Sequence, residues 1–128
     1  MKLDGVHHIA LNVKDLDRAE KFYTEVLGFP VTHRFSKGLR HLMLDTGNAA
    51  IALFETPDLE TRKHLDQLSE TGYMHLAFKT TRERFDQIIA EMKEKKVTID
   101  SGPIRRGDGD SIYFNDPDFN HLEIHCKD

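Results

Sequence analysis

The stretch HIALNV, residues 8–13, returns in the second half of the chain as HLAFKT, residues 75–80. Each copy opens with a histidine, follows it with a large aliphatic residue and an alanine, and precedes a stretch with helical spacing of apolar residues. Self-similarity of this kind indicates a duplicated structural unit. The two stretches therefore predict a chain built from two copies of one module, each opening with a strand that starts at a histidine.

A helix is predicted after each copy. Asp15 is a suitable N-cap for the first helix, and Gly28 is a suitable residue to end it. Residues 80–83, TTRE, have the pattern of a capping box at the start of the second helix. The apolar residues that share one face are Leu16, Ala19, Tyr23, Val26 and Leu27 in the first helix, and Phe85, Ile88, Ile89 and Met92 in the second.

Three strand-like runs follow each helix and are separated by turn signals rich in glycine, asparagine and aspartate. The runs cover residues 30–36, 39–46 and 49–54, and then residues 97–100, 111–115 and 121–126. Each half is thus predicted to be a βαβββ module, which makes the fold class α+β. We expect module 1 over about residues 5–56, a linker over 57–71 with a short helix at 59–68, and module 2 over 72–127. The modules would form one domain with a curved mixed sheet around a cavity.

Composition excludes several classes of function. The net charge of −4 offers no basic face to nucleic acid or to an anionic membrane, and no apolar run approaches the length of a membrane span. The one cysteine, Cys126, can form neither an intrachain disulfide nor a cysteine-based zinc site. We expect a cytoplasmic protein. Histidine is unusually frequent, with eight among 128 residues, and histidines bind metals.

The last predicted strand places His121, Glu123 and His125 at alternate positions, with aliphatic residues between them. Because side chains alternate along a strand, these three share one face, which is either solvent or a polar cavity. When the last strands of the two halves are aligned, Ala52 stands where the second half has Glu123. Taken alone, each of these residues would more often be an ordinary surface or packed side chain than a ligand.

The chain resembles the vicinal oxygen chelate superfamily, whose members include glyoxalase I, methylmalonyl-CoA epimerase, extradiol dioxygenases, fosfomycin-resistance enzymes and bleomycin-binding proteins. VHHIALNVKDLDRAEKFYTEVLGF is similar to the family's opening strand and helix, GYMHLAF to its second opening, and SIYFNDPDFNHLEIH to its closing hairpin. The resemblance implies the glyoxalase/bleomycin resistance/dihydroxybiphenyl dioxygenase fold, with its cavity as a metal site.

The resemblance also implies metal ligands at His8, His75 and Glu123, with Ala52 in place of the fourth ligand that some members have. Two imidazoles and one carboxylate suit Fe(II) or Mn(II), and Ni(II) or Zn(II) can also bind such a set. Small members of the family pair modules between chains, so we expect a homodimer in which His8 of one chain meets His75 and Glu123 of the other. Glu123, His121, His125 and Tyr113 are the candidate catalytic residues, with one of the two histidines lining the cavity.

The expected activity is that of a dioxygenase-like or glyoxalase-like enzyme acting on a small molecule with vicinal oxygens. A first alternative is a fosfomycin-type thiol transferase or hydrolase, because GDGDSIYFNDPD resembles the segment that binds the phosphonate, which makes Ser111 and Tyr113 candidate substrate-binding residues. Ala10, where those enzymes have threonine or cysteine, and the lack of a further arginine after the last strand depart from that pattern. A second alternative is a metal-free drug-binding protein of the bleomycin-resistance kind, which the retained histidines and Glu123 disfavour.

Overall fold

The computed structural model describes residues 1–60 and 74–128, and these fall into two units. We call them module 1, Met1–Thr61, and module 2, Arg62–Asp128. The boundary between them falls within the linker predicted from the sequence. The short helix predicted over residues 59–68 lies almost wholly outside the described residues.

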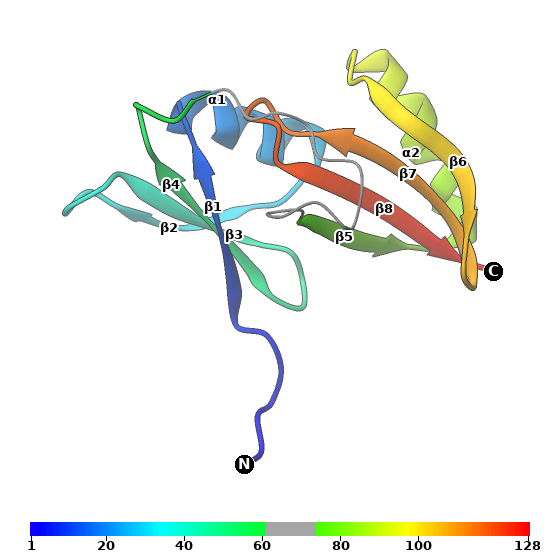
Figure 1. Ribbon diagram of the computed structural model, residues 1–128, viewed down its shortest axis with the longest axis horizontal. Helices are drawn as coiled ribbons and strands as arrows, with labels where there is room; N and C mark the ends of the chain where they lie inside the picture. Colours follow the sequence, from blue (N-terminus) through cyan, green and yellow to red (C-terminus); the bar gives the residue numbers. More distant parts are fainter. Residues whose placement is uncertain (61–73) are drawn as a thin grey trace. The chain divides into compact units, whose positions relative to one another are not determined.

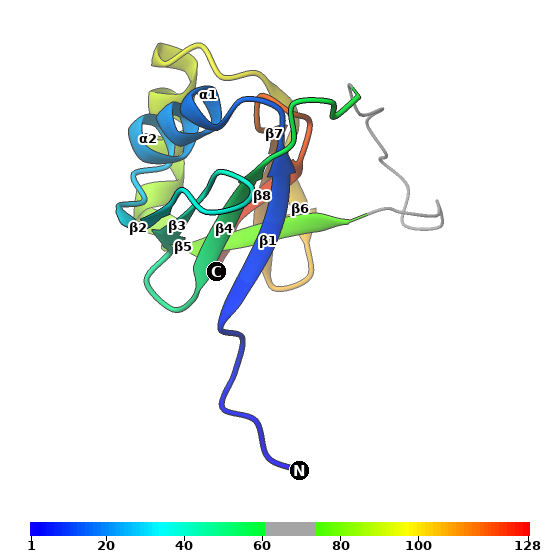
Figure 2. The ribbon, with the colours of Figure 1, turned by 90° about the vertical axis from the view of Figure 1, so that its left-hand side faces the viewer.

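Module 1 has the predicted βαβββ order. Its elements are β1 (His8–Val13), α1 (Leu16–Lys21), the π-helical turn η1 (Phe22–Val26), β2 (Val31–Phe35), β3 (His41–Asp45) and β4 (Ala50–Glu55). The four strands form one sheet in the order β1-β4-β3-β2. Strand β1 runs parallel beside β4, and the other pairs are antiparallel (Figure 2).

Module 2 repeats this topology. Its elements are β5 (His75–Thr80), α2 (Arg82–Glu94), β6 (Ile99–Arg106), β7 (Gly109–Asn115) and β8 (His121–Lys127). The strand order β5-β8-β7-β6, with β5 parallel to β8, matches that of module 1 strand for strand. The predicted α+β fold with two βαβββ modules is therefore confirmed. Helix α2 lies along one face of this sheet (Figure 1).

The helix-covered face of each sheet is the apolar one. In β8, Leu122, Ile124 and Cys126 are buried, and in α2 Phe85 and Met92 are buried with them. Burying side chains of this size contributes roughly 1.5–3 kcal/mol each. The same alternation in module 1 buries Leu11, Val13, Leu42, Leu44, Ile51 and Leu53. The residues that alternate with these buried positions therefore lie on the opposite face of each sheet.

Three local predictions were wrong in detail. The first helix does not continue unchanged to residue 27, because it widens to a π turn in which the Leu27 amide donates to the carbonyl of Phe22 at 3.3 Å. The N-cap of α2 is Thr81 rather than Thr80, and its side chain accepts from the amide of Arg84. Strand β6 extends to Arg106 instead of ending at residue 100, since two irregularities in its pairing with β7 carry it past Pro103, which has no amide hydrogen.

Within the described residues, no helix has the length and apolar character needed to cross a membrane.

Candidate metal centre

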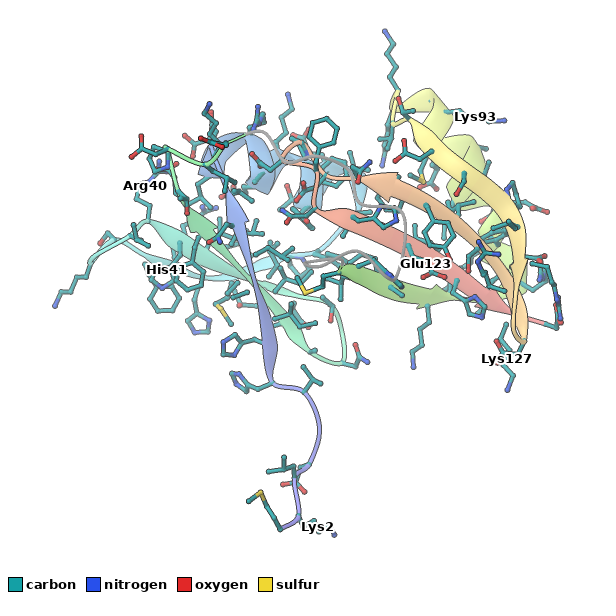
Figure 3. All side chains as sticks on the ribbon, in the orientation of Figure 1. Lys2, Arg40, His41, Lys93, Glu123 and Lys127 are labelled. Carbon is teal, nitrogen blue, oxygen red and sulfur yellow. The ribbon has the colours of Figure 1, made fainter. Side chains whose placement is uncertain are left out.

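The open face of the module 2 sheet carries a concentration of polar and ionisable side chains. Alternation along β8 puts His121, Glu123 and His125 on the face opposite the buried Leu122 and Ile124. In Figure 3 the labelled Glu123 projects from β8, and helix α2 lies behind the sheet. The residues of β7 directly opposite these three are Asn115, Tyr113 and Ser111, so the same face continues across two strands. This face contains most of the candidate site residues of module 2.

His75 and Glu123 are brought together by the parallel pairing of β5 with β8. The register sets His75 beside His121 and Ala77 beside Glu123, so that the small side chain of Ala77 leaves room for a diagonal contact. His75 Nε2 lies 3.0 Å from Glu123 Oε2. Glu123 is only 7% exposed, which is rare for a carboxylate unless it has partners.

The other oxygen of Glu123 belongs to a chain of polar contacts. The Ser111 hydroxyl donates to Glu123 Oε1 at 2.6 Å, and His125 Nδ1 lies 2.8 Å from the same hydroxyl oxygen. On its far side, His125 Nε2 lies 2.8 Å from Asp108 Oδ1. This hydrogen bond to His125 is the main cause that lowers the pKa of Asp108. Ser111, predicted to bind substrate, is fully buried, and its hydroxyl contacts Glu123 and His125.

Tyr113 and His121 form an aromatic wall beside His75. Their rings stack with centroids 5.6 Å apart and 11° between planes, and both meet the His75 ring edge-on. Arg106 Nε donates to the Tyr113 hydroxyl at 3.2 Å, and its guanidinium carbon lies 5.8 Å from the centre of the Tyr113 ring. His121 Nδ1 lies 3.3 Å from Asn115 Oδ1. A permanent cation and a phenol are thus placed together on the face that carries Glu123.

His8 opens β1 in module 1, at the position equivalent to His75, and it is exposed. Its Nδ1 lies 2.8 Å from His7 Nδ1, and the two rings are edge to face. His7 precedes the strand and does not follow its alternation, which is why its ring can lie against that of His8. The parallel register pairs His8 with Ala50 and Ala10 with Ala52, and in module 2 it pairs His75 with His121 and Ala77 with Glu123.

The open face of the module 1 sheet carries a row of stacked rings. His41 lies between Phe35 and Phe54, with ring centroids 4.4 and 4.5 Å away and planes within 11° of parallel. His33 stacks on Phe35 from the other end. His41 projects from β3 in Figure 3. His33 and His41, which were not candidate site residues, are therefore members of an aromatic row; His64 lies outside the described residues.

The model of the Glyoxalase/Bleomycin resistance protein/Dioxygenase superfamily matches residues 5–124 of this chain. The chain belongs to this superfamily. Among its relatives, the Metallothiol transferase FosB of Staphylococcus epidermidis is 32% identical over 126 residues, which cover 98% of this chain and 83% of that protein. The Fosfomycin resistance protein FosX of Listeria monocytogenes is 31% identical over 131 residues, covering 97% and 90%. A crystal structure of FosX complexed with Mn(II) and sulfate ion superposes with a TM-score of 0.75 and 26% identity, covering 99% and 93%.

FosB is named as a metallothiol transferase, and the FosX crystal structure contains Mn(II), so the donor atoms of this chain bear on whether it fits a divalent ion. In neither described module do three or more His, Cys, Asp or Glu side chains meet in a group that could hold a metal ion. Module 2 supplies two of the three expected ligands. Two cis ligands bonded at about 2.1 Å stand roughly 3.0 Å apart, and His75 Nε2 and Glu123 Oε2 have a separation of 3.0 Å. One imidazole and one carboxylate are also a donor set that Mn(II) and Fe(II) accept, so this pair fits the ion.

Two residues of the site were missed by sequence reasoning. Neither Asp108 nor Arg106 was among the candidate residues predicted from the sequence. The signal for Asp108 was its place directly before β7, because the first residue of that strand, Gly109, pairs with Lys127 near the end of β8, where His125 also lies. The signal for Arg106 depended on the true length of β6, which the sequence did not reveal.

Proposed function

We propose that this protein is a divalent-metal-dependent enzyme of the fosfomycin-modifying type, which adds a thiol or water to a small oxygenated molecule. The observation that carries the proposal is the pairing of His75 Nε2 with Glu123 Oε2 at 3.0 Å on a polar sheet face. The kinship with FosB and FosX, whose names specify a metallothiol transferase and a fosfomycin resistance protein, supports this reading over a dioxygenase.

His75 and Glu123 are the proposed ligands of module 2, and His8 is the proposed third ligand. Glu123 supplies the one negative charge of this set, and Ser111 holds its Oε1 so that Oε2 is the oxygen turned toward His75. When bound, a divalent ion polarises a substrate oxygen and stabilises negative charge on it. Mn(II) is the proposed first choice, since it is the ion in the FosX complex; Fe(II), Ni(II) and Zn(II) suit the same donors.

Tyr113 and Arg106 are proposed to bind the substrate. The phenol hydroxyl accepts from Arg106 Nε, which leaves its hydrogen for an acceptor on the substrate. The guanidinium adds further donors in a planar fork that suits a carboxylate or a phosphonate. Arg106 thereby supplies a cation beside Tyr113 for such a group. For His121, the stacking on Tyr113 supports a role in fixing that ring.

The test is an assay of metal-stripped protein that is reloaded separately with Mn(II), Fe(II), Ni(II) or Zn(II). Each form is incubated with fosfomycin alone or with glutathione or L-cysteine, and the phosphonate is followed by ³¹P NMR. A new phosphonate signal that requires both metal and a thiol identifies a transferase, and one that requires metal alone identifies a hydrolase. Oxygen uptake with catechols under the same conditions would instead support the dioxygenase reading. Drug binding without stoichiometric metal would support sequestration.

A homodimer that shares His8 between chains remains our proposal for assembly. Sedimentation of the Mn(II)-loaded protein at micromolar concentration tests it, because a monomer that retains its metal would contradict sharing between chains. Mixing His8→Ala protein with Glu123→Ala protein is a second test. If each site takes His8 from one chain and Glu123 from the other, half of the sites in a mixed dimer carry both residues, and metal binding partly returns.

A further inference from the structure

We infer that Asp108, in the hairpin turn between β6 and β7, is a positioning residue that fixes the carboxylate of Glu123 through His125 and Ser111. This inference rests on the proposed function, because it takes Glu123 to be a metal ligand. His125 and Ser111 lie between Asp108 and Glu123, and the side chain of Asp108 is 60% exposed. It touches neither His75 nor Glu123 in any described contact, so it acts only through the residues between.

The chain of contacts is continuous. Asp108 Oδ1 lies 2.8 Å from His125 Nε2, His125 Nδ1 lies 2.8 Å from Ser111 Oγ, and Ser111 Oγ lies 2.6 Å from Glu123 Oε1. An ionised carboxylate only accepts, and Ser111 donates its one hydrogen to Glu123, so the other two links require a hydrogen on each ring nitrogen of His125. Each link is within hydrogen-bonding distance.

Each intermediate residue is fixed by its strand. Ser111 of β7 stands directly opposite His125 of β8, and Tyr113 stands opposite Glu123, so the Ser111 hydroxyl lies between two successive open-face residues of β8. Ser111 is fully buried and Glu123 nearly so, which limits the access of solvent to this pair. The imidazole of His125 is a quarter exposed. Its Nε2 atom faces the surface, where it meets the carboxylate of Asp108 at the end of the chain of contacts.

The backbone holds Asp108 in place at the end of the chain. Its carbonyl accepts from the amide of Asp128 at 3.0 Å, which ties the turn to the end of β8. A Cβ on the adjacent Gly109 would come within 1.8 Å of the carbonyl oxygen of Cys126, so the turn and β8 approach as closely as the backbone allows. Asp108 is therefore held against His125 by the hairpin itself. Partners that orient a metal ligand typically change metal affinity or activity by roughly 10–100-fold when they are removed.

The experiment measures metal binding without substrate. Mn(II) affinity is determined by EPR titration, and the visible absorption of the Co(II)-loaded protein reports the ligand geometry. Asp108→Ala should weaken Mn(II) binding about tenfold, the lower end of the range for a lost orienting partner, and should shift the Co(II) bands. Asp108→Asn keeps an acceptor oxygen, and its effects should be smaller. Asp86→Ala, which removes an exposed aspartate from α2, is the matched control and should behave as wild type.

Three results would overturn the inference. Wild-type Mn(II) affinity and an unchanged Co(II) spectrum in Asp108→Ala would show that Asp108 does not position Glu123. An equal loss in Asp86→Ala would assign the effect to surface charge. If Asp108→Ala does not fold, Asp108→Asn decides alone, and a wild-type spectrum with wild-type affinity would again count against the inference. Absence of metal binding by the wild-type protein would overturn the proposed function as well, whereas the first result leaves the proposed function standing.

Discussion

Ala52 occupies in module 1 the register position that Glu123 occupies in module 2. Ala52 stands opposite Ala10 across the parallel pair β1–β4, and Glu123 stands opposite Ala77 across the parallel pair β5–β8. His8, which opens β1, lies two residues before Ala10, and His75, which opens β5, lies two residues before Ala77. The two modules thus have the same strand register at this position. They differ in the side chain, which is a methyl group in module 1 and a carboxylate in module 2.

We predict that Ala52→Glu raises the affinity for divalent metal. Ala52 is 1% exposed, so an unpaired carboxylate there should destabilise the metal-free protein, because burying a charge without a partner is costly. A bound ion would supply that partner. The increase in Tm caused by saturating Mn(II) should therefore be larger than in wild type, and each tenfold gain in affinity adds about 1.4 kcal/mol.

Ala52→Gln is the control for Ala52→Glu, since it has nearly the same size and lacks the charge. It should destabilise the metal-free protein without strengthening Mn(II) binding. If Ala52→Glu and Ala52→Gln respond to Mn(II) alike, Ala52 does not face the metal, and the equivalence with Glu123 is one of backbone register alone. Catalysis that needs several open positions on the ion should fall in Ala52→Glu.

Glu123→Gln should abolish most metal binding while the fold survives. The amide keeps an acceptor oxygen for the Ser111 hydroxyl but loses the negative charge beside His75. Mn(II) affinity should fall by more than the roughly 10–100-fold expected for a lost orienting partner, because the proposed ligand itself is altered. Isothermal titration with Mn(II) measures this, and Glu91→Gln on the exposed side of α2 is the control. Full metal content and full turnover in Glu123→Gln would exclude Glu123 as a ligand.

The fold could be predicted from the sequence because the same order of strands and helix is encoded in both halves of the chain. The alternation of Leu122, Ile124 and Cys126 with His121, Glu123 and His125 determined the two faces of β8, and the structure buries the first set. The histidine at the start of each copy indicated where the parallel strands begin. Such periodic patterns depend only on residues that are close in sequence, so they can be recognised without knowledge of tertiary contacts.

The contacts around Glu123 could not be predicted in the same way, because they depend on pairing between strands. Whether Ser111 faces His125 or its neighbour is decided by the connection at residues 116–120, which joins β7 to β8, and a shift of one residue would send Ser111 to the other face. Strand β6 was predicted to end at residue 100, and the Gly102 and Pro103 that follow are residue types that typically interrupt a strand. The π turn at Phe22 likewise left no signal in the apolar spacing.

Gly109→Ala should destabilise module 2 and disturb the metal centre. A Cβ at this position would lie 1.8 Å from the carbonyl oxygen of Cys126, so β7 and β8 would have to separate where Asp108 meets His125. We expect a loss of at least about 2 kcal/mol in the free energy of unfolding, measured by urea denaturation. Gly107→Ala is the control, because its Cβ would enter open space and the positive φ of 56° alone should cost roughly 1 kcal/mol. Equal losses in both variants would contradict the close approach of the two strands.

The stability contributed by Asp128 should depend on pH. A hydrogen bond from Arg105, followed by its positive charge and the contact with Arg82, lowers the pKa of Asp128 to about 2. Because the pKa in the folded state lies below the ordinary value of about 3.9, the contribution is fully present above pH ~5 and is lost as the pH falls toward 2. Asp128→Asn should therefore lower Tm at pH 7 by a small amount, since all three side chains are about half exposed.

The difference in Tm between wild type and variant should shrink below pH ~4 and should also shrink in high salt. Asp86→Asn, which breaks no arginine contact, is the control. A Tm difference that stays constant from pH 7 to 3 would mean that the two arginines do not stabilise the Asp128 carboxylate.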